Sequence, residues 1–195
     1  MGQLIRHQHI PKTGSTSTKK FYKDCIVYGY QNGQHTLNAD IPEDAISFTV
    51  LRDPLERFQS CINYCLRNGK LNLELAIDII FNRKFTAEQL SDALKFQAIN
   101  DYPEEYLVFH SMSIFDPFLN VFDEKQNLKA THLINFNNLQ TELMELFPDH
   151  NYLNFPRENN SSRTIQLSAE HREQFEYHFA EDIKYYNQTG FKEKL

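Results

Sequence analysis

The sequence predicts an α/β fold in which a parallel β-sheet is flanked by helices. Short apolar runs, of which residues 46–51 (ISFTVL) are the clearest, alternate with segments of helical character. This alternation is typical of a parallel sheet covered by helices. The 195 residues are 41% hydrophobic and 24% charged, which suits one domain with a sizeable core. We therefore expect residues 1–195 to form a single domain.

The first part of the chain predicts one strand followed directly by a helix. Residues 3–10 are expected to form a strand, residues 11–14 a loop and residues 15–25 a helix. Residues 26–30 form a short β-rich run, and the Gln-Asn-Gly-Gln sequence at 31–34 is typical of a turn.

A second buried strand is predicted over residues 46–51, and a helix follows it to about Arg67. Asp53 is the expected N-cap of this helix, with Pro54 at its first position and Glu56 completing a capping box. Three apolar side chains at helical spacing are expected to face the core: Leu55, Phe58 and Ile62.

The rest of the chain predicts one more strand and four helices. Ser168 is the expected N-cap of the last and longest helix. Ligands of parallel sheets bind beyond the carboxyl ends of the strands, so the residues that follow each strand are the first candidates for a site. The predicted elements are the strand 130–136 and the helices 73–82, 86–101, 137–147 and 168–187.

Charge and cysteine content narrow the classes of function. The net charge is -6 and the pI is near 5.7, which argues against a broad nucleic-acid surface. An anionic ligand would have to be held by a local cluster of donors. Cys25, Cys61 and Cys65 are expected to be small buried side chains in a reducing compartment, with neither a disulfide framework nor a metal site.

The residues after the first predicted strand have the chemistry of an anion-binding loop. Gly14 would let the backbone turn and approach a ligand closely, while free N–H groups at the helix start and the charge of Lys12 would attract an anion. The lysine precedes the glycine and GxxxxGK is absent, so the loop is not a Walker A motif. A hydroxyl-rich helix start with a solvated lysine is the alternative. Four hydroxyl side chains add donors: Thr13, Ser15, Thr16 and Ser17.

A second polar cluster follows the second predicted strand, in the sequence FTVLRDPLERFQS. Arg52 is aimed at the same carboxyl edge of the sheet as the first loop, and Ser60 lies two helical turns further on. Arg57, three residues before Ser60, either contacts the ligand or forms a surface ion pair. Two anion sites at the ends of two parallel strands predict a ligand with two separate phosphate groups.

Both segments resemble motifs of one enzyme family. HIPKTGSTS resembles the 5′-phosphosulfate loop of sulfotransferases that use 3′-phosphoadenosine 5′-phosphosulfate (PAPS), and FTVLRDPLERFQS resembles their 3′-phosphate motif. The pair is similar to the carbohydrate sulfotransferases that include the heparan-sulfate and uronyl 2-O-sulfotransferases. THLINFNNLQTELMELF and EDIKYYNQTGF resemble later segments of that family. The resemblance is weakest over residues 71–129, and Ser15 replaces a second glycine found in many relatives.

The resemblance implies a P-loop-nucleotide-kinase-like sulfotransferase fold and a role for each matching residue. PAPS would be the donor and its desulfated product would be adenosine 3′,5′-bisphosphate (PAP), with no metal. The acceptor would be a hydroxyl, expected on a saccharide. Residues 157–163 would form either a lid over the nucleotide or a solvated loop. The 5′-phosphosulfate would be held by Lys12, Thr13, Gly14, Ser15, Thr16 and Ser17, and the 3′-phosphate by Arg52 and Ser60.

The family also implies where such a protein resides. Its eukaryotic members are Golgi membrane proteins, whereas this sequence shows no signal peptide and no apolar run of the ~20 residues that span a membrane. A cytoplasmic enzyme without a membrane anchor is therefore expected.

Sulfuryl transfer needs a base for the acceptor hydroxyl and a cation for the leaving phosphate. Lys12 suits the second role, and histidine suits the first near neutral pH. His35 is the first candidate, because its segment GQHTL is similar to a GH-containing segment of the family. His110, which could line an acceptor pocket, is the second. His7 and His9 lie on the first predicted strand, and one of them is expected to face the core.

Two other functions remain open from the sequence. A nucleotide or small-molecule kinase would need Mg²⁺ ligands, but the apolar strand at 46–51 is followed by Arg52 and not by an aspartate. A noncatalytic nucleotide- or glycan-binding module would keep both phosphate sites and show no turnover.

Overall fold

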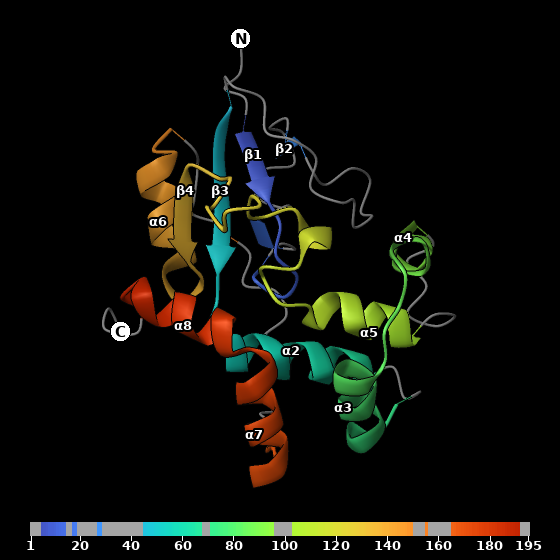
Figure 1. Cartoon of the computed structure of the whole chain (residues 1–195). Coiled ribbons are helices and arrows are strands. Elements are labelled where there is room, and N and C mark those ends of the chain that lie inside the picture. Colours follow the sequence, from blue (N-terminus) through green and yellow to red (C-terminus); the bar gives the residue numbers. More distant parts are fainter. Residues whose placement is uncertain are drawn as a thin grey trace.

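The computed structural model describes residues 5–14, 17–18, 27–28, 45–67, 71–95, 103–149, 155 and 165–191. Within these residues the protein is an α/β fold with a parallel sheet of strand order β2-β1-β3-β4, flanked by helices (Figure 1). The predicted fold class is thus confirmed at this level. Because β2 contributes only two residues, the three longer strands make up most of the sheet. The strands are β1 (Ile5–Gln8), β2 (Val27–Tyr28), β3 (Ile46–Leu51) and β4 (His132–Asn135).

β3 is the central strand of the three longer ones and lies parallel to both neighbours. Its residues Ser47–Leu51 are buried, as expected for a strand covered on both faces. One face packs against α6 (Leu139–Leu146), where Phe48 and Val50 meet Leu143. The opposite face packs against α4 (Ala87–Lys95) and α5 (Pro103–Ser111), where Leu51 joins an apolar cluster with side chains of both helices.

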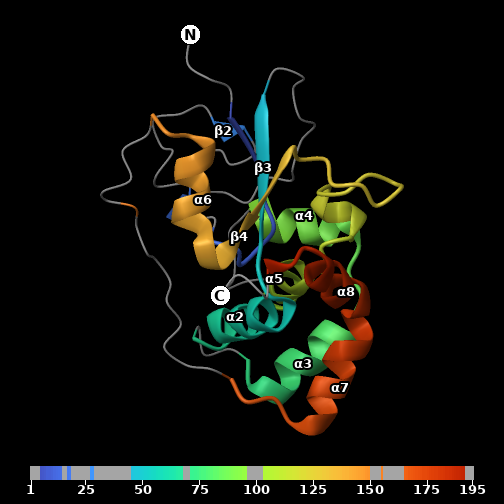
Figure 2. The ribbon, with the colours of Figure 1, turned by 90° about the vertical axis from the view of Figure 1, so that its left-hand side faces the viewer.

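A group of helices lies beyond the carboxyl ends of the strands. In Figures 1 and 2 the strands point toward α2 (Pro54–Leu66) and α8 (Ala180–Gln188), while α3 (Leu73–Asn82) and α7 (Ala169–His178) lie further from the sheet. Phe58 of α2 packs against Phe175 and Phe179, with ring centroids 5.1 and 5.6 Å away. Two 3-10 turns complete the described elements: η1 (Pro117–Leu119) and η2 (Phe136–Asn138).

The start of α2 is built as its sequence predicts, with one difference. The Asp53 carboxylate accepts hydrogen bonds from the backbone N–H groups of Leu55 and Glu56, and Pro54 occupies the first turn. The carboxylate of Glu56 accepts a hydrogen bond from Arg52 Nε at 3.3 Å. In a capping box this carboxylate would accept from the backbone N–H of Asp53. Here Glu56 accepts from the side chain of Arg52 instead.

A buried ion pair joins α2 to α8. Arg57 Nη2 lies 3.4 Å from Asp182 Oδ1 and donates to the carbonyl oxygen of Met112 at 2.6 Å. Asp182 also accepts from the Ser113 hydroxyl and from the N–H of Ile114. The two charged side chains are only 3% and 2% exposed, so the expected surface ion pair of Arg57 is in fact a buried one.

The C-terminal helix differs most from the sequence prediction. A single helix was expected over residues 168–187, beginning at Ser168. Ser168 does cap α7 by accepting from the N–H of His171, but the helix ends at Phe179, whose φ of -110° and ψ of 23° are not helical. α8 then leaves in a new direction (Figure 1). Phe179 is buried against Phe58, so tertiary packing fixes the break.

Other predictions are confirmed in part. The helix expected over 86–101 is described up to Lys95 as α4, and α5 was not predicted at all. The strand expected over 3–10 is shorter, and the turn at 31–34 lies outside the described residues. Cys61 and Cys65 are buried free thiols, as expected, whereas Cys25 also lies outside.

Among the helices that the structure describes, no long apolar helix of the kind that crosses a membrane is found.

Asp182→Ala is expected to destabilise the fold by about 3–5 kcal/mol, because it leaves Arg57 as an uncompensated buried charge. Urea denaturation measures this loss. Glu181→Ala, the matched control at an exposed neighbouring position of α8, is expected to cost less than about 1 kcal/mol. Similar losses for the two variants would contradict the role given to the ion pair.

Candidate functional site

The loop after β1 turns sharply before a helix begins. Lys12 and Gly14 both have positive φ angles, 67° and 83°, a conformation that is uncommon for a non-glycine residue. The N–H of Thr18 then bonds to the carbonyl oxygen of Gly14 at 3.0 Å, and residues 17–18 are helical. The positive end of a helical turn therefore lies directly behind the loop.

Gly14 is required by its surroundings as well as by its φ angle. A Cβ at this position would lie 3.0 Å from Leu139 Cδ2 and 3.1 Å from Phe136 Cε2. These side chains follow β4, so the loop after β1 is pressed against the segment after β4. The lack of a side chain at Gly14 thus allows a close approach to the protein itself, whereas the predicted approach to a ligand stays a prediction.

The hydroxyl residues of the loop have different surroundings. Thr13 is fully buried, and its hydroxyl donates to the carbonyl oxygen of Ile10 at 2.7 Å. Its side chain therefore stabilises the turn, and only its backbone is left for a ligand. Ser17 is buried in the first helical turn, while Ser15 and Thr16 lie outside the described residues.

Arg52 brings the two predicted loops together. Its Nη1 lies 3.4 Å from the carbonyl oxygen of Lys12, across 40 positions of sequence. The guanidinium also stacks on Phe136, at 4.4 Å from the ring centre. Its side chain is 17% exposed, so part of its donor fork is open to solvent. The carboxyl ends of β1, β3 and β4 thus meet at Arg52.

The Lys12 ammonium does not extend freely into solvent. Nζ lies 4.1 Å from the centre of the Tyr64 ring, on α2. Burial lowers the pKa of Lys12 below its usual value, the charges of Arg52 and Arg67 lower it further, and the thiols of Cys61 and Cys65 oppose the shift. The ammonium is therefore partly desolvated, which strengthens its attraction to an anion.

Ser60 lies on the helix face that supports this loop. Residues four apart share a face of a helix, so Glu56, Ser60 and Tyr64 form a row that continues from Arg52. Arg52 contacts the Lys12 carbonyl oxygen and Tyr64 contacts the Lys12 ammonium. The half-buried Ser60 lies between these contacts in the row.

The structure describes only some of the histidines that were considered as the base or as core residues. His35 lies outside the described residues. His110 is described and is buried at 2% exposure, with Nδ1 2.7 Å from the carbonyl oxygen of Tyr106. A carbonyl oxygen only accepts, so Nδ1 carries a proton and Nε2 is the basic nitrogen of the neutral ring. Both His7 and His9 are buried, and burial lowers the pKa of His7 to about 3.

Two buried amides lie at the carboxyl ends of the strands without full hydrogen bonding. Gln8 ends β1 and Asn135 ends β4, and both are 0% exposed. Within the described part of the chain, the Gln8 side-chain amide and Asn135 Nδ2 have no hydrogen-bond partner. Buried polar atoms of this kind are normally satisfied, so both strand ends offer free polar groups.

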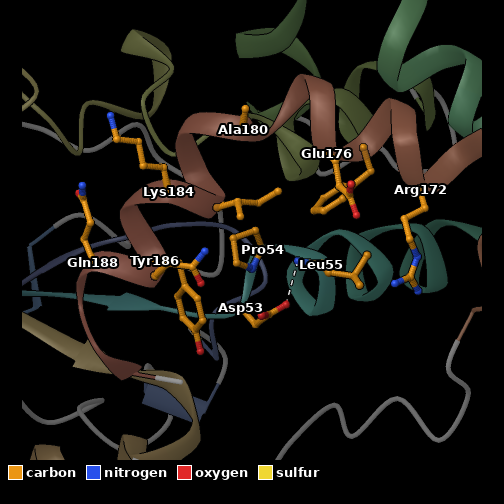
Figure 3. A pocket seen from close by; sticks show the side chains of 12 residues that line it. Asp53, Pro54, Leu55, Arg172, Glu176, Ala180, Lys184, Tyr186 and Gln188 are labelled. Carbon is orange, nitrogen blue, oxygen red and sulfur yellow. Dashed lines mark hydrogen bonds between the residues drawn. The ribbon is translucent and has the colours of Figure 1, made fainter. Parts of the chain in front are cut away.

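A separate groove of about 790 Å³ runs between the start of α2 and the α7–α8 pair (Figure 3). It combines apolar side chains such as Leu55 and Ile183 with exposed charges, among them Arg172 and Lys184. The groove meets the loop after β3 at Asp53. None of the predicted site residues that the structure describes lines it: Lys12, Thr13, Gly14, Ser17, Arg52, Ser60 and His110 all lie elsewhere.

Sequence reasoning missed Asn135 and Tyr64 as parts of the site. Asn135 could have been found by the same strand-end rule that identified Arg52, because it ends the strand of ATHLINF. Tyr64 could have been found from its spacing of four residues after Ser60.

Comparison with known protein families, curated proteins and solved structures returns no match for this chain. The geometry of the two strand-end loops therefore carries the functional argument.

Gly14→Ala is expected to destabilise the protein more than Gly190→Ala. Both glycines have positive φ, which costs about 1–2 kcal/mol for alanine, but nothing lies within 4 Å of a Cβ at Gly190. At Gly14 the contacts with Leu139 and Phe136 add to that cost. Urea denaturation of both variants measures the difference, and equal losses would show that the two side chains move aside freely.

Proposed function

We propose that the protein is a PAPS-dependent sulfotransferase that acts on a hydroxyl acceptor, expected on a carbohydrate. The observation that carries this proposal is the contact of Arg52 with the carbonyl oxygen of Lys12. It joins two cationic strand-end loops into one site at the carboxyl edge of the sheet. The sequence resemblance supports the identity of the donor, and the meeting of the two loops supports one shared site for its two anionic ends.

The residues at this edge fit a donor with two anionic groups. The loop from Lys12 to Ser17 would hold the 5′-phosphosulfate through its backbone N–H groups and the Lys12 ammonium. The partly exposed guanidinium of Arg52 and the hydroxyl of Ser60 would hold the 3′-phosphate. The amide of Gln8, which ends β1 just before the loop and has no partner among the described residues, would offer further donors to the same region.

The bound donor supplies an activated sulfuryl group: the acceptor oxygen bonds to sulfur as the bond from sulfur to the phosphate oxygen breaks, which leaves PAP. Lys12 would stabilise the charge that develops on this phosphate. A histidine would take the proton of the acceptor hydroxyl. We assign this role to His35, with His110 as the alternative because its basic Nε2 belongs to a ring close to Tyr64, 6.2 Å between centroids.

A noncatalytic binding module remains the second candidate, because the described candidate base, His110, is only 2% exposed and so has little surface open to an acceptor. A kinase is less well supported, since Arg52 and not an aspartate follows β3.

The protein is expected to bind PAP far more tightly than AMP or ATP, without added metal, because only PAP carries the 3′-phosphate. Arg52→Ala is expected to weaken PAP binding by about ten- to hundredfold, the usual worth of a charged hydrogen bond, and to leave AMP binding nearly unchanged. Isothermal titration calorimetry measures both affinities.

Arg172→Ala is the matched control, since it removes an exposed arginine from the separate groove and should not change PAP affinity. If AMP and PAP bound equally well, the two-phosphate proposal would be wrong.

His35→Ala is expected to lower turnover by about 10²–10⁴-fold, the usual contribution of a positioned base, and to leave PAP binding unchanged. His110→Ala is expected to alter the acceptor KM more than turnover. Assays with labelled PAPS and a panel of saccharides measure both turnover and acceptor KM.

Near-normal turnover in His35→Ala together with an inactive His110→Ala would transfer the role of base to His110. PAP binding with no transfer to any acceptor would favour the binding module.

A further inference from the structure

The Lys12 side chain is fixed at both of its ends. At the backbone, Lys12 has a positive φ and its carbonyl oxygen lies 3.4 Å from Arg52 Nη1. At the tip, Nζ lies 4.1 Å from the centre of the Tyr64 ring. This distance is well inside the ~6 Å range of a cation–π interaction. A lysine that is held in this way loses most of its rotamer freedom before any ligand binds.

The Tyr64 ring packs against two rings of α5. It lies 5.9 Å from the Tyr106 ring and 6.2 Å from the His110 ring, both in stacked orientation. Tyr106 and His110 stack on each other at 3.9 Å, and His110 Nδ1 bonds to the Tyr106 carbonyl oxygen. Both of these supporting residues are buried. Tyr64 therefore presents a fixed aromatic face to Lys12.

A ring face and an anion can share one ammonium group. The group has three N–H donors, and the ring attracts the cation from one side only. The N–H donors that point away from the ring can bond to phosphate oxygens. An ammonium that is already placed and partly desolvated needs little reorganisation when charge develops on the leaving group.

We propose that Tyr64 is a positioning residue that holds the Lys12 ammonium in its working place, and that the stacked Tyr106 ring supports it. This inference rests on the proposed function for its consequence in turnover, but the placement of Lys12 is a property of the protein alone. Tyr64 acts through Lys12 and does not itself contact the transferred group.

NMR of the free protein tests the placement. The Lys12 Hε signals, assigned by their loss in Lys12→Ala, are expected upfield because they lie over an aromatic face. They should stay upfield in Tyr64→Phe, which keeps the ring, and return to ordinary positions in Tyr64→Leu and Tyr64→Met. They should also stay upfield when PAP is bound. A return to ordinary positions on PAP binding would make Tyr64 only a resting place and would overturn the proposal.

A double-mutant cycle tests the consequence for turnover. Tyr64→Leu is expected to lower kcat by about three- to thirtyfold, the range of a cation–π contact, with a smaller change in PAP affinity. Tyr64→Phe should stay within about twofold of the wild type. In the Lys12→Ala background, Tyr64→Leu should have no further effect, because residues that act through one contact are not additive. Multiplicative losses would overturn the proposal.

The two sets of measurements separate the two proposals. If the wild-type protein neither binds PAP nor transfers sulfuryl groups, the proposed function fails, and the NMR shifts of the free protein alone decide the placement of Lys12. If PAP binds and transfer occurs while the Lys12 signals are not upfield, the proposed function stands and the role of Tyr64 is wrong. Tyr64→Met, an unbranched replacement, provides the comparison should Tyr64→Leu fail to fold.

Discussion

The position of α2 depends on the buried ion pair between Arg57 and Asp182. α2 enters directly from β3 at its N-terminal end, and the ion pair fixes its next turn against α8 and the carbonyl oxygen of Met112. Asp182 takes two further hydrogen bonds, from Ser113 and Ile114, which offset the cost of removing both charges from water. Because α2 also carries Ser60 and Tyr64, the pair sets the helix face on which the loop after β1 rests.

Two arginines only five residues apart thus have opposite roles. Arg57 is 3% exposed and committed to protein partners, whereas Arg52 is 17% exposed and lies at the strand end. Place in the chain and depth, and not residue type, distinguish them: Arg52 lies before the helix and Arg57 lies on its buried face. Arg52 is partly held by Glu56 and by the Phe136 ring, so its guanidinium is oriented before a ligand arrives. A preorganised cation of this kind binds an anion without a large loss of side-chain entropy.

Much of the fold could be predicted from local sequence, because local interactions determine it. β3 and α3 have the predicted bounds, and the Asp53 cap follows from the chemistry of the first helical turn. α5 could not be predicted, since it is covered on several sides and shows almost no polar face. The break at Phe179 contains neither glycine nor proline, and only its packing against Phe58 explains it.

The candidate site was predictable in its charged parts and not in its aromatic part. Lys12, Gly14 and Arg52 stand at strand ends, where the topology of a parallel sheet brings them to one edge. Tyr64 shares a helix face with Ser60, but this spacing is equally that of a packing residue, so the sequence gives no reason to expect its contact with Lys12. Its contact with Lys12 arises across 52 positions of the chain, which local patterns do not report.

The contact between Gly14 and Leu139 has a consequence for how the protein is made. The loop after β1 leaves the ribosome early, but the side chains that press on it are synthesised more than a hundred residues later. A nascent chain that ends before this point therefore has the residues of the loop without the side chains that press on them. Such distant pairings close slowly, because loop entropy must be lost before the contact forms. The loop after β1 thus takes its final shape only after β4 and the segment that follows it have been synthesised.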